Sequence, residues 1–439
     1  MSGVTVALLA LLVMMILLAI RVPIGVSMLT VGLGGYIFLA GWSPAINGLK
    51  SLAYDQYSSY TFSIVPLFLL MGEFATRAGL SQALFRSANT WLGHRRGGIA
   101  MATIGGSAGF GAIAGSSLAT AATMAQVALP EMRKYGYSGA LATGSVAAGG
   151  TLGILIPPSI VLVLYAILTE QNIAKLFAAA FIPGFLAAFG YMIAIYIYAR
   201  LRPGESQPGE RVGYRERFIE LWRVWPVLVI FLLVIGGIYA GFFTPTEAAA
   251  VGAVSTLLVA LAKRTMTWRV LRQSLVNTAA TTGMIFLIVL GAELINIFLA
   301  LSRLPQTAAA RIGDWQVAPI VILIAILLLY FLLGTVMDSL SMILLTTPIF
   351  FPIIMGMDFG MPPEELAIWF GILTLVTVEV GLITPPVGLN VYIINSLAPD
   401  VPMIETFRGV VPFLISDLIR VALLVAFPAI TLAALWWFF

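Results

Sequence analysis

Long apolar stretches, separated by short polar segments, follow one another along almost the whole chain. A helix that crosses a bilayer needs about 20 mostly apolar residues, and ten of these stretches approach or exceed that length. The pattern predicts an all-α polytopic membrane protein. We expect its spanning helices near residues 4–20, 24–41, 61–77, 139–169, 174–199, 225–242, 247–262, 274–300, 365–396 and 411–438.

Two further apolar segments, 98–130 and 317–355, are interrupted near their centres by small or polar residues. The first contains Gly115-Ser116-Ser117, and the second contains Asp338-Ser339. Glycine permits a tight turn, and small residues let two backbones approach closely in a membrane. Each segment is predicted to be a re-entrant helical hairpin that enters and leaves on one side.

Two of the predicted spans contain a double proline. Pro157-Pro158 lies inside 139–169, and Pro385-Pro386 lies inside 365–396. Proline lacks an amide donor and disfavours helix at the preceding residue, so both helices should be broken. In lipid, broken backbone is tolerated only where protein buries it or where it lines a polar cavity. Paired broken helices therefore point to the midplane binding site of a carrier.

The chain also appears as two related halves. Chance similarity between leucine-rich segments is the alternative, but several landmarks recur in order at an offset of 222 residues: Pro23 with Pro245, Ser117 with Ser339, and Pro130 with Pro352. Five spans per half is an odd number, so the second half is expected to insert upside down, as in an inverted repeat. We assign 1–199 and 225–439 to the two repeats and 200–224 to a cytoplasmic linker.

Charge placement predicts the orientation. With the N-terminus outside, 18 Lys and Arg residues lie in cytoplasmic segments, and only Lys50, Lys175, Arg303 and Arg311 lie outside. This bias follows the positive-inside rule. Residues 1–20 carry no Lys or Arg and no cleavage site follows, so we expect a first membrane helix rather than a signal peptide. In the linker, Phe218, Leu221, Trp222 and Trp225 recur at helical spacing and predict an amphipathic interfacial helix.

The composition argues against several classes of enzyme. The chain has no Cys and a single His, His94, beside two arginines in a predicted loop. The chain therefore does not have the residues for disulfides, thiolate catalysis, Cys/His metal sites or Ser–His catalysis. An intramembrane aspartyl-type site stays open, because Asp338 and Glu379 could meet. The net charge of +4 lies in loops and does not indicate a nucleic-acid partner. We expect a non-enzyme.

Two acids at membrane depth are the strongest candidates for function. A charged side chain there costs at least ~2.5 kcal/mol, so the default interpretation is functional. Asp338 is expected to form a cation site or to cap a hairpin helix, and Glu379 to bind an ion or a backbone amide. Glu73 and Glu293 are weaker candidates.

Cations are scarce at this depth. Arg420 is expected near the inner end of the last helix, and no Lys or Arg is placed at the midplane. Arg21, beside Pro23, is the nearest cation for an anionic substrate, although it could equally extend to the lipid headgroups. Unwound carbonyls at the breaks would suit Na⁺, and the N-termini of half-helices would suit an anion.

Several blocks resemble the large membrane subunit of TRAP (tripartite ATP-independent periplasmic) transporters, of the DctM type. They are Gly115–Ala121, Leu129–Met132, Gly136-Tyr137, Ala148–Ser159 and Gly381–Gly388 with Asn390. The resemblance implies sodium-driven import of an organic acid anion across a bacterial inner membrane by an elevator mechanism. It also implies a periplasmic binding protein (DctP type) and a four-helix small membrane subunit (DctQ type). Because the chain starts at the first large-subunit helix, we expect the small subunit as a separate chain.

The resemblance also implies site residues between each hairpin tip and its broken helix. Co-transported Na⁺, with no organic cofactor, is expected near Ser116, Ser117, Gly150 and Pro157, and near Asp338, Ser339, Thr377 and Pro385. For the substrate we expect Ser116, Ser117, Thr151, Ser339, Thr384 and Arg21. A stand-alone sodium/carboxylate symporter of related architecture is the alternative. An ATP-driven permease is disfavoured, because nothing resembles its cytoplasmic coupling loop.

Overall fold

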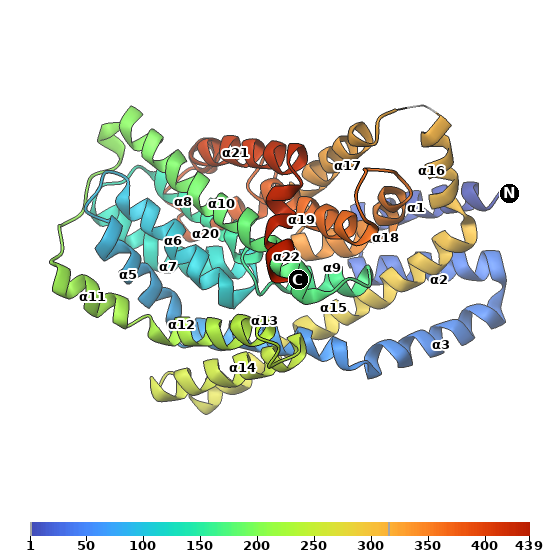
Figure 1. Ribbon diagram of the computed structural model, residues 1–439, viewed down its shortest axis with the longest axis horizontal. Helices are drawn as coiled ribbons and strands as arrows, with labels where there is room; N and C mark the ends of the chain where they lie inside the picture. Colours follow the sequence, from blue (N-terminus) through green and yellow to red (C-terminus); the bar gives the residue numbers. More distant parts are fainter. Residues whose placement is uncertain (1, 315–316) are drawn as a thin grey trace.

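A computed structural model describes residues 2–314 and 317–439 of the protein (Figure 1). Regular structure in these two ranges is helical, without a strand, which confirms the predicted all-α class. The N-terminus lies at one end of the long axis, beside α1 and α16, whereas the C-terminus lies near the centre of the view (Figure 1).

The first half contains ten α-helices, which include both members of a hairpin and of a broken helix. They are α1 (Gly3–Ala19), α2 (Ile24–Ala40), α3 (Trp42–Ser58), α4 (Ile64–Arg77), α5 (Leu80–Leu92), α6 (Gly98–Ala114), α7 (Ser117–Lys134), α8 (Gly139–Leu155), α9 (Ile160–Leu168) and α10 (Ile173–Leu201). A 3₁₀ turn, η1 (Tyr60–Ser63), precedes α4, and η2 (Pro203–Glu205) opens the linker.

The linker and the second half contain the remaining helical elements. Their elements are α11 (Tyr214–Trp222), α12 (Trp225–Phe231), the π-helical turn η3 (Leu232–Gly236), α13 (Gly237–Tyr239), α14 (Pro245–Ala262), α15 (Trp268–Ser302), α16 (Leu304–Asp314), α17 (Pro319–Gly334), α18 (Ser339–Met355), α19 (Pro363–Leu382), α20 (Leu389–Leu397), α21 (Met403–Ala426) and α22 (Ala429–Phe438).

All ten predicted spans coincide with helices, but fewer of them could cross a membrane as single rods. In the described ranges, five helices are long and apolar enough: α10, α14, α15, α19 and α21. Three bent pairs raise this number to eight, and their bends are 56° (α3 with η1–α4), 43° (α8 with α9) and 44° (α11 with α12–α13). Helices α1 and α2 have 17 residues each, slightly short of the length required.

The sequence missed three helices and misplaced the starts of two others, one of which is α15, since it begins at Trp268 rather than near residue 274. Helices α3, α5 and α16 were not predicted, because they mix polar with apolar residues. The expected single span 411–438 begins at Met403 instead and is interrupted between α21 and α22 at Phe427-Pro428. Pro428 has no amide donor, which explains the interruption. The predicted amphipathic linker helix is confirmed as α11.

Helices of the two halves pack in pairs across the molecule. Helix α15 packs along α2, α14 packs on α4, and α21 packs on α8. Small residues allow the close approach: a Cβ placed on Gly409 of α21 would lie 1.9 Å from the Ala140 carbonyl oxygen of α8. The halves therefore form one interlocked body, although the relative inversion of the repeats stays a prediction.

Each hairpin packs against the broken helix of its own half. Helices α6 and α7 contact α8, while α17 and α18 contact α19. The second segments of the broken helices cross over, since α9 contacts α18 and α20 contacts both α7 and α8. In this way the packing joins both hairpins and both breaks into a single region.

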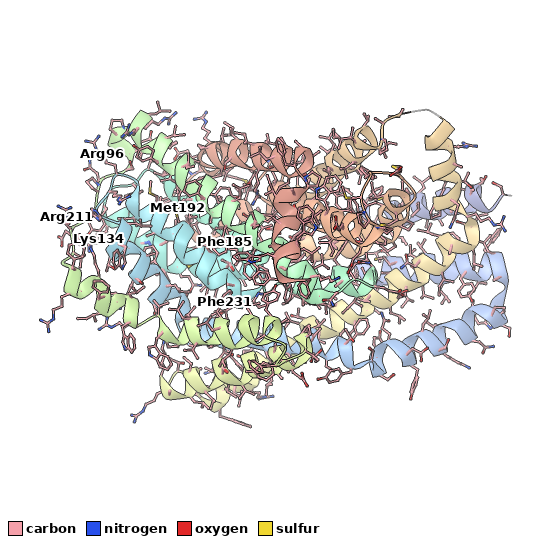
Figure 2. All side chains as sticks on the ribbon, in the orientation of Figure 1. Arg96, Lys134, Phe185, Met192, Arg211 and Phe231 are labelled. Atoms are coloured by element: carbon pink, nitrogen blue, oxygen red, sulfur yellow. The ribbon has the colours of Figure 1, made fainter. Side chains whose placement is uncertain are left out.

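Positive charges gather at one end of the molecule. Figure 2 shows Arg96, Lys134 and Arg211 at the end that also carries α11. They come from the α5–α6 turn, the end of α7 and the linker. The grouping agrees with the predicted cytoplasmic side, whereas Phe185, Met192 and Phe231 lie nearer the middle (Figure 2).

Candidate functional site

The first hairpin turns at Gly115 and Ser116, as the sequence indicates. Gly115 ends α6 with φ of 61°, a left-handed conformation that glycine adopts without strain. Ser116 is the N-cap of α7, and its hydroxyl accepts a hydrogen bond from the Ala119 amide at 3.4 Å. This turn orients Ser117, which is buried, towards the second half of the chain.

The tip of this hairpin lies directly on the break of α8. A Cβ placed on Gly153 would lie 2.6 Å from the Ser116 carbonyl oxygen and 2.4 Å from Thr120 Oγ1. Only glycine fits this approach. A Cβ on Gly115 would lie 3.3 Å from the Pro158 carbonyl oxygen. The predicted break is confirmed, because α8 ends at Leu155, and the Pro157-Pro158 peptide bond, which is cis, is buried.

The second hairpin uses different residues for the same turn. Asp338 is the N-cap of α18, and its carboxylate accepts a hydrogen bond from the Ser341 amide at 3.0 Å, so its predicted capping role is confirmed. The Thr335 carbonyl oxygen accepts from the Gly388 amide at 3.0 Å, which ties the tip to the break of α19. Pro385, in contrast to Pro157, is exposed.

One carboxylate joins the two hairpins. Glu379 on α19 is fully buried; Ser117 Oγ donates to its Oε2 and Ser339 Oγ donates to its Oε1, both at 2.5 Å. The two serines are the pair that the 222-residue offset matched in the sequence. The partners of Glu379 are therefore two hydroxyls rather than a backbone amide. These two short hydrogen bonds make Glu379 a direct link between the two tips.

A second buried polar network lies beside the first and was not predicted. Tyr191 on α10 donates to Asp417 Oδ2 at 2.7 Å, and Asp417 Oδ1 lies 2.8 Å from Arg420 Nη2. Thr151 Oγ1, on α8, lies 3.1 Å from the Tyr191 hydroxyl. The expectation for Arg420 was wrong, because it lies well inside α21 and is only 3% exposed. The sequence did contain an indication of this buried pair, because an Asp and an Arg three residues apart in an apolar helix seldom face lipid.

Asn390 provides a further link between the halves. Asn390 is the second residue of α20 and is fully buried. Its Nδ2 donates a hydrogen bond to the Ala147 carbonyl oxygen of α8 at 3.2 Å. A Cβ placed on Gly150 would lie 3.1 Å from the same nitrogen. Gly150 is thus placed beside the first hairpin and the second broken helix together.

The other predicted residues are held within their own helices or lie elsewhere. Thr377 donates to the Leu373 carbonyl oxygen at 2.8 Å, and Thr384 donates to that of Val380 at 2.7 Å. Arg21 lies in the exposed turn between α1 and α2. Within the described ranges, no hydrogen bond or ion pair joins Arg21 to either hairpin.

The polar groups of this region are mainly oxygen atoms. The tips and breaks offer serine hydroxyls, the carboxylates of Asp338 and Glu379, and carbonyl groups near the ends of α8 and α19. The sequence contains no cysteine, so a soft thiolate donor is excluded. Such a region can bind a hard cation, and the N-terminus of α7, capped by the neutral Ser116 hydroxyl, can bind an anion.

Comparisons with known proteins give the family of the chain. A family model described as "Tripartite ATP-independent periplasmic transporter, DctM component" matches residues 11–430. The C4-dicarboxylate TRAP transporter large permease protein DctM of Pseudomonas aeruginosa is 37% identical over 92% of this chain and 93% of that protein. The sialic acid TRAP transporter large permease protein SiaM of Vibrio cholerae is 32% identical over 95% of both.

Two more distant matches extend the comparison. The isethionate TRAP transporter permease protein DctMQ of Oleidesulfovibrio alaskensis is 31% identical, over 94% of this chain and 64% of that protein. The crystal structure of the Alcanivorax borkumensis YdaH transporter is similar in fold, with a TM-score of 0.62 and 14% identity over 88% of each chain. Since the family model and relatives above 30% identity span almost its whole length, the chain belongs to the DctM family of TRAP transporter large permeases, multi-pass proteins of the membrane.

Proposed function

We propose that this permease imports an organic acid anion together with Na⁺ across the inner membrane of a bacterium. The relatives are named for C4-dicarboxylates, sialic acid and isethionate, all of which carry an acidic group. The observation that carries the proposal is the seating of both hairpin tips on both broken helices, with Glu379 between them. Broken helices that meet in this way are where carriers bind their cargo.

The sodium ions bind at the two tips in this proposal. The first site uses oxygen atoms from Ser116, Ser117, Gly150 and Pro157, and the second uses oxygen atoms from Asp338, Ser339, Thr377 and Pro385. The placement of the Ser116 carbonyl against Gly153 supports the first site. The carboxylate of Asp338 at the second tip supports the second, because it adds negative charge there.

The N-cap residues of α7 and α18 differ in charge, and this difference determines which hairpin tip binds the substrate anion in this proposal. Asp338 places a carboxylate at the N-terminus of α18, which disfavours an anion at that position. Ser116 caps α7 with a neutral hydroxyl, so this cap adds no negative charge at the positive end of the helix dipole. We therefore place the substrate carboxylate at the first tip, near Ser116 and Ser117, with Na⁺ at both tips.

The transport step in this proposal is an elevator movement. The pairs α2–α15 and α4–α14 form the scaffold, while the hairpins and broken helices form the moving part. The two parts touch through α4 with α6 and through α15 with α18, the surfaces that would slide. One charge moving through 100 mV gains ~2.3 kcal/mol, so a few sodium ions suffice for accumulation.

The partners are a small four-helix membrane subunit and a periplasmic binding protein. The experiment is uptake into proteoliposomes that contain both membrane subunits, with the binding protein outside. Radiolabelled C4-dicarboxylate, sialic acid and isethionate are supplied in turn, with either Na⁺ or K⁺ outside. We expect uptake of one of them that requires both Na⁺ and the binding protein.

Two results would change this conclusion. Uptake that is unaffected when K⁺ replaces Na⁺ rejects sodium coupling. Uptake that proceeds fully without the binding protein indicates instead a stand-alone sodium/carboxylate symporter.

A further inference from the structure

A groove of about 690 Å³ lies where α5, α11, α12 and α14 meet. Its polar lining comes from the ends of these helices, and its apolar lining includes Leu258 and Val259 of α14. The groove is separate from the hairpin region, and the proposed transport cycle gives it no role. The lining residues with charged or amide groups are Gln82, Arg86, Glu220, Arg223 and Lys263, and those with an indole group are Trp222 and Trp225.

The charge of the groove is positive. It has three cations, Arg86, Arg223 and Lys263, against one carboxylate, Glu220, which pairs with Arg223. Lys263 Nζ donates to the Ala78 carbonyl oxygen at 3.2 Å, and burial lowers the pKa of this ammonium group. An anion placed among these groups would gain attraction from Arg86 and Lys263, neither of which pairs with a carboxylate in the described part of the chain.

Two tryptophans mark the groove as a place at the membrane surface. Trp222 is 75% exposed and Trp225 is 50% exposed, and they stand at the junction of the amphipathic helix α11 with α12. Tryptophan is enriched where headgroups meet acyl chains. The groove lies beside the cationic end of the molecule, which the charge pattern assigns to the cytoplasm.

We propose that this groove binds one anionic phospholipid of the cytoplasmic leaflet. The phosphate lies among Arg86, Arg223 and Lys263, and an acyl chain passes Trp225 to reach Leu258. Basic pockets on the cytoplasmic side between membrane helices suit acidic headgroups, and the apolar wall of α14 suits the chain. Neither a free anion nor a polar peptide would use both parts of this lining.

Because of the position of the groove, a lipid bound in it would affect transport. Helix α5 packs on the hairpin helices α6 and α7, whereas α14 packs on α4. A lipid between α5 and α14 therefore joins the moving part to the scaffold, a consequence that rests on the proposed function. Lipid binding itself does not depend on it.

The binding test uses the purified full-length chain and native mass spectrometry. Phosphatidylglycerol and phosphatidylcholine with the same acyl chains are titrated, and glycerol 3-phosphate is the soluble competitor. We expect phosphatidylglycerol to bind more tightly and glycerol 3-phosphate not to displace it. Each cation near a membrane surface contributes roughly fivefold to affinity for an anionic lipid, so R86Q/K263Q should weaken phosphatidylglycerol binding ~25-fold.

Two further variants distinguish this site from general surface charge and from misfolding. R269Q/R272Q removes two exposed cations at the start of α15, outside the groove, and should leave the preference unchanged. E220Q removes the only carboxylate of the groove and frees Arg223, so it should strengthen phosphatidylglycerol binding, which a damaged protein would not do.

Several outcomes would overturn the proposal. Equal binding of the two lipids, or equal losses in R86Q/K263Q and R269Q/R272Q, would reject the site. Displacement by glycerol 3-phosphate would assign it to a soluble anion, and loss of the bound lipid on adding the small subunit would assign it to that partner. Uptake that is the same in phosphatidylglycerol and phosphatidylcholine liposomes, despite selective binding, would reject only the influence on transport.

Discussion

Ser117 and Ser339, 222 residues apart, donate hydrogen bonds to the two oxygens of a single buried carboxylate, that of Glu379. Each serine is the first residue of the second helix of its hairpin. Neither tip can leave its position without breaking a hydrogen bond to Glu379. The first prediction concerns this link.

Replacing Glu379 by Gln should reduce substrate uptake by roughly tenfold or more. Glutamine keeps the shape, but its amide nitrogen cannot accept the hydrogen bond that one of the serines donates, and a buried hydrogen bond contributes about 0.5–1.5 kcal/mol. S117A and S339A should each give a smaller loss, and the double variant should resemble E379Q rather than the product of the single effects. Uptake in proteoliposomes measures these losses. S396A, an exposed serine of α20, is the control, and normal uptake by E379Q would contradict the coupling.

Gly153→Ala should separate the first tip from its broken helix. The added methyl would meet the Ser116 carbonyl oxygen and Thr120 Oγ1, and overpacking of this kind costs about 1–3 kcal/mol. We expect a lower unfolding temperature in detergent and reduced uptake. Gly283→Ala on α15 is the matched control, because its Cβ would meet nothing within 4 Å. Equal behaviour of the two variants would show that the tip does not need this contact.

The Asp417–Arg420 pair should stabilise the protein only while it is complete. Removing one member of a buried ion pair leaves the other charge uncompensated, which costs about 3–5 kcal/mol. D417N and R420M should therefore lower the unfolding temperature strongly, and D417L/R420M should recover part of the loss. Y191F, which removes one hydrogen bond, should cost about 1 kcal/mol. Thermal unfolding in detergent decides this, and a stable R420M would refute it.

Glu205 should make stability depend on pH. Burial raises the pKa of this carboxyl, but hydrogen bonds from Tyr198, Ser138 (2.9 Å) and Arg202 (3.1 Å) outweigh burial and hold it below its ordinary value. The folded state therefore holds the proton less tightly than the unfolded state. The stabilisation is complete above the unfolded pKa of about 4.3 and is lost as the pH falls through the lower folded value.

The measurement is the unfolding temperature between neutral and acidic pH. The wild type should lose stability on acidification, whereas E205Q should start lower at neutral pH and change less. E210Q, on the same linker and exposed, is the control and should follow the wild type. If the unfolding temperature of E205Q changed with pH in the same way as that of the wild type, Glu205 would not be the source of the pH dependence.

Features fixed by local chemistry were predictable from the sequence. The double prolines that begin at Pro157 and Pro385 interrupt their helices, and Gly115 followed by Ser116 favours a turn, so the hairpins and breaks lie where expected. The partners of Glu379 were not predictable, because Ser117 and Glu379 are separated by 262 residues and meet only through packing. The hydrogen bond from Tyr191 to Asp417 was not predictable for the same reason, because 226 residues separate the two. Helices α3 and α5 were missed because their mixed polarity resembles a loop.

The hydrogen bonds between early and late helices have a consequence for how the cell makes this protein. The ribosome delivers Ser117, Tyr191 and the Ala147 carbonyl group early, but their partners Glu379, Asp417 and Asn390 emerge only near the end of synthesis. Until then the nascent chain holds polar groups in the bilayer without these partners. The early helices must therefore remain loosely arranged, and the last quarter of the chain completes their assembly by inserting among them.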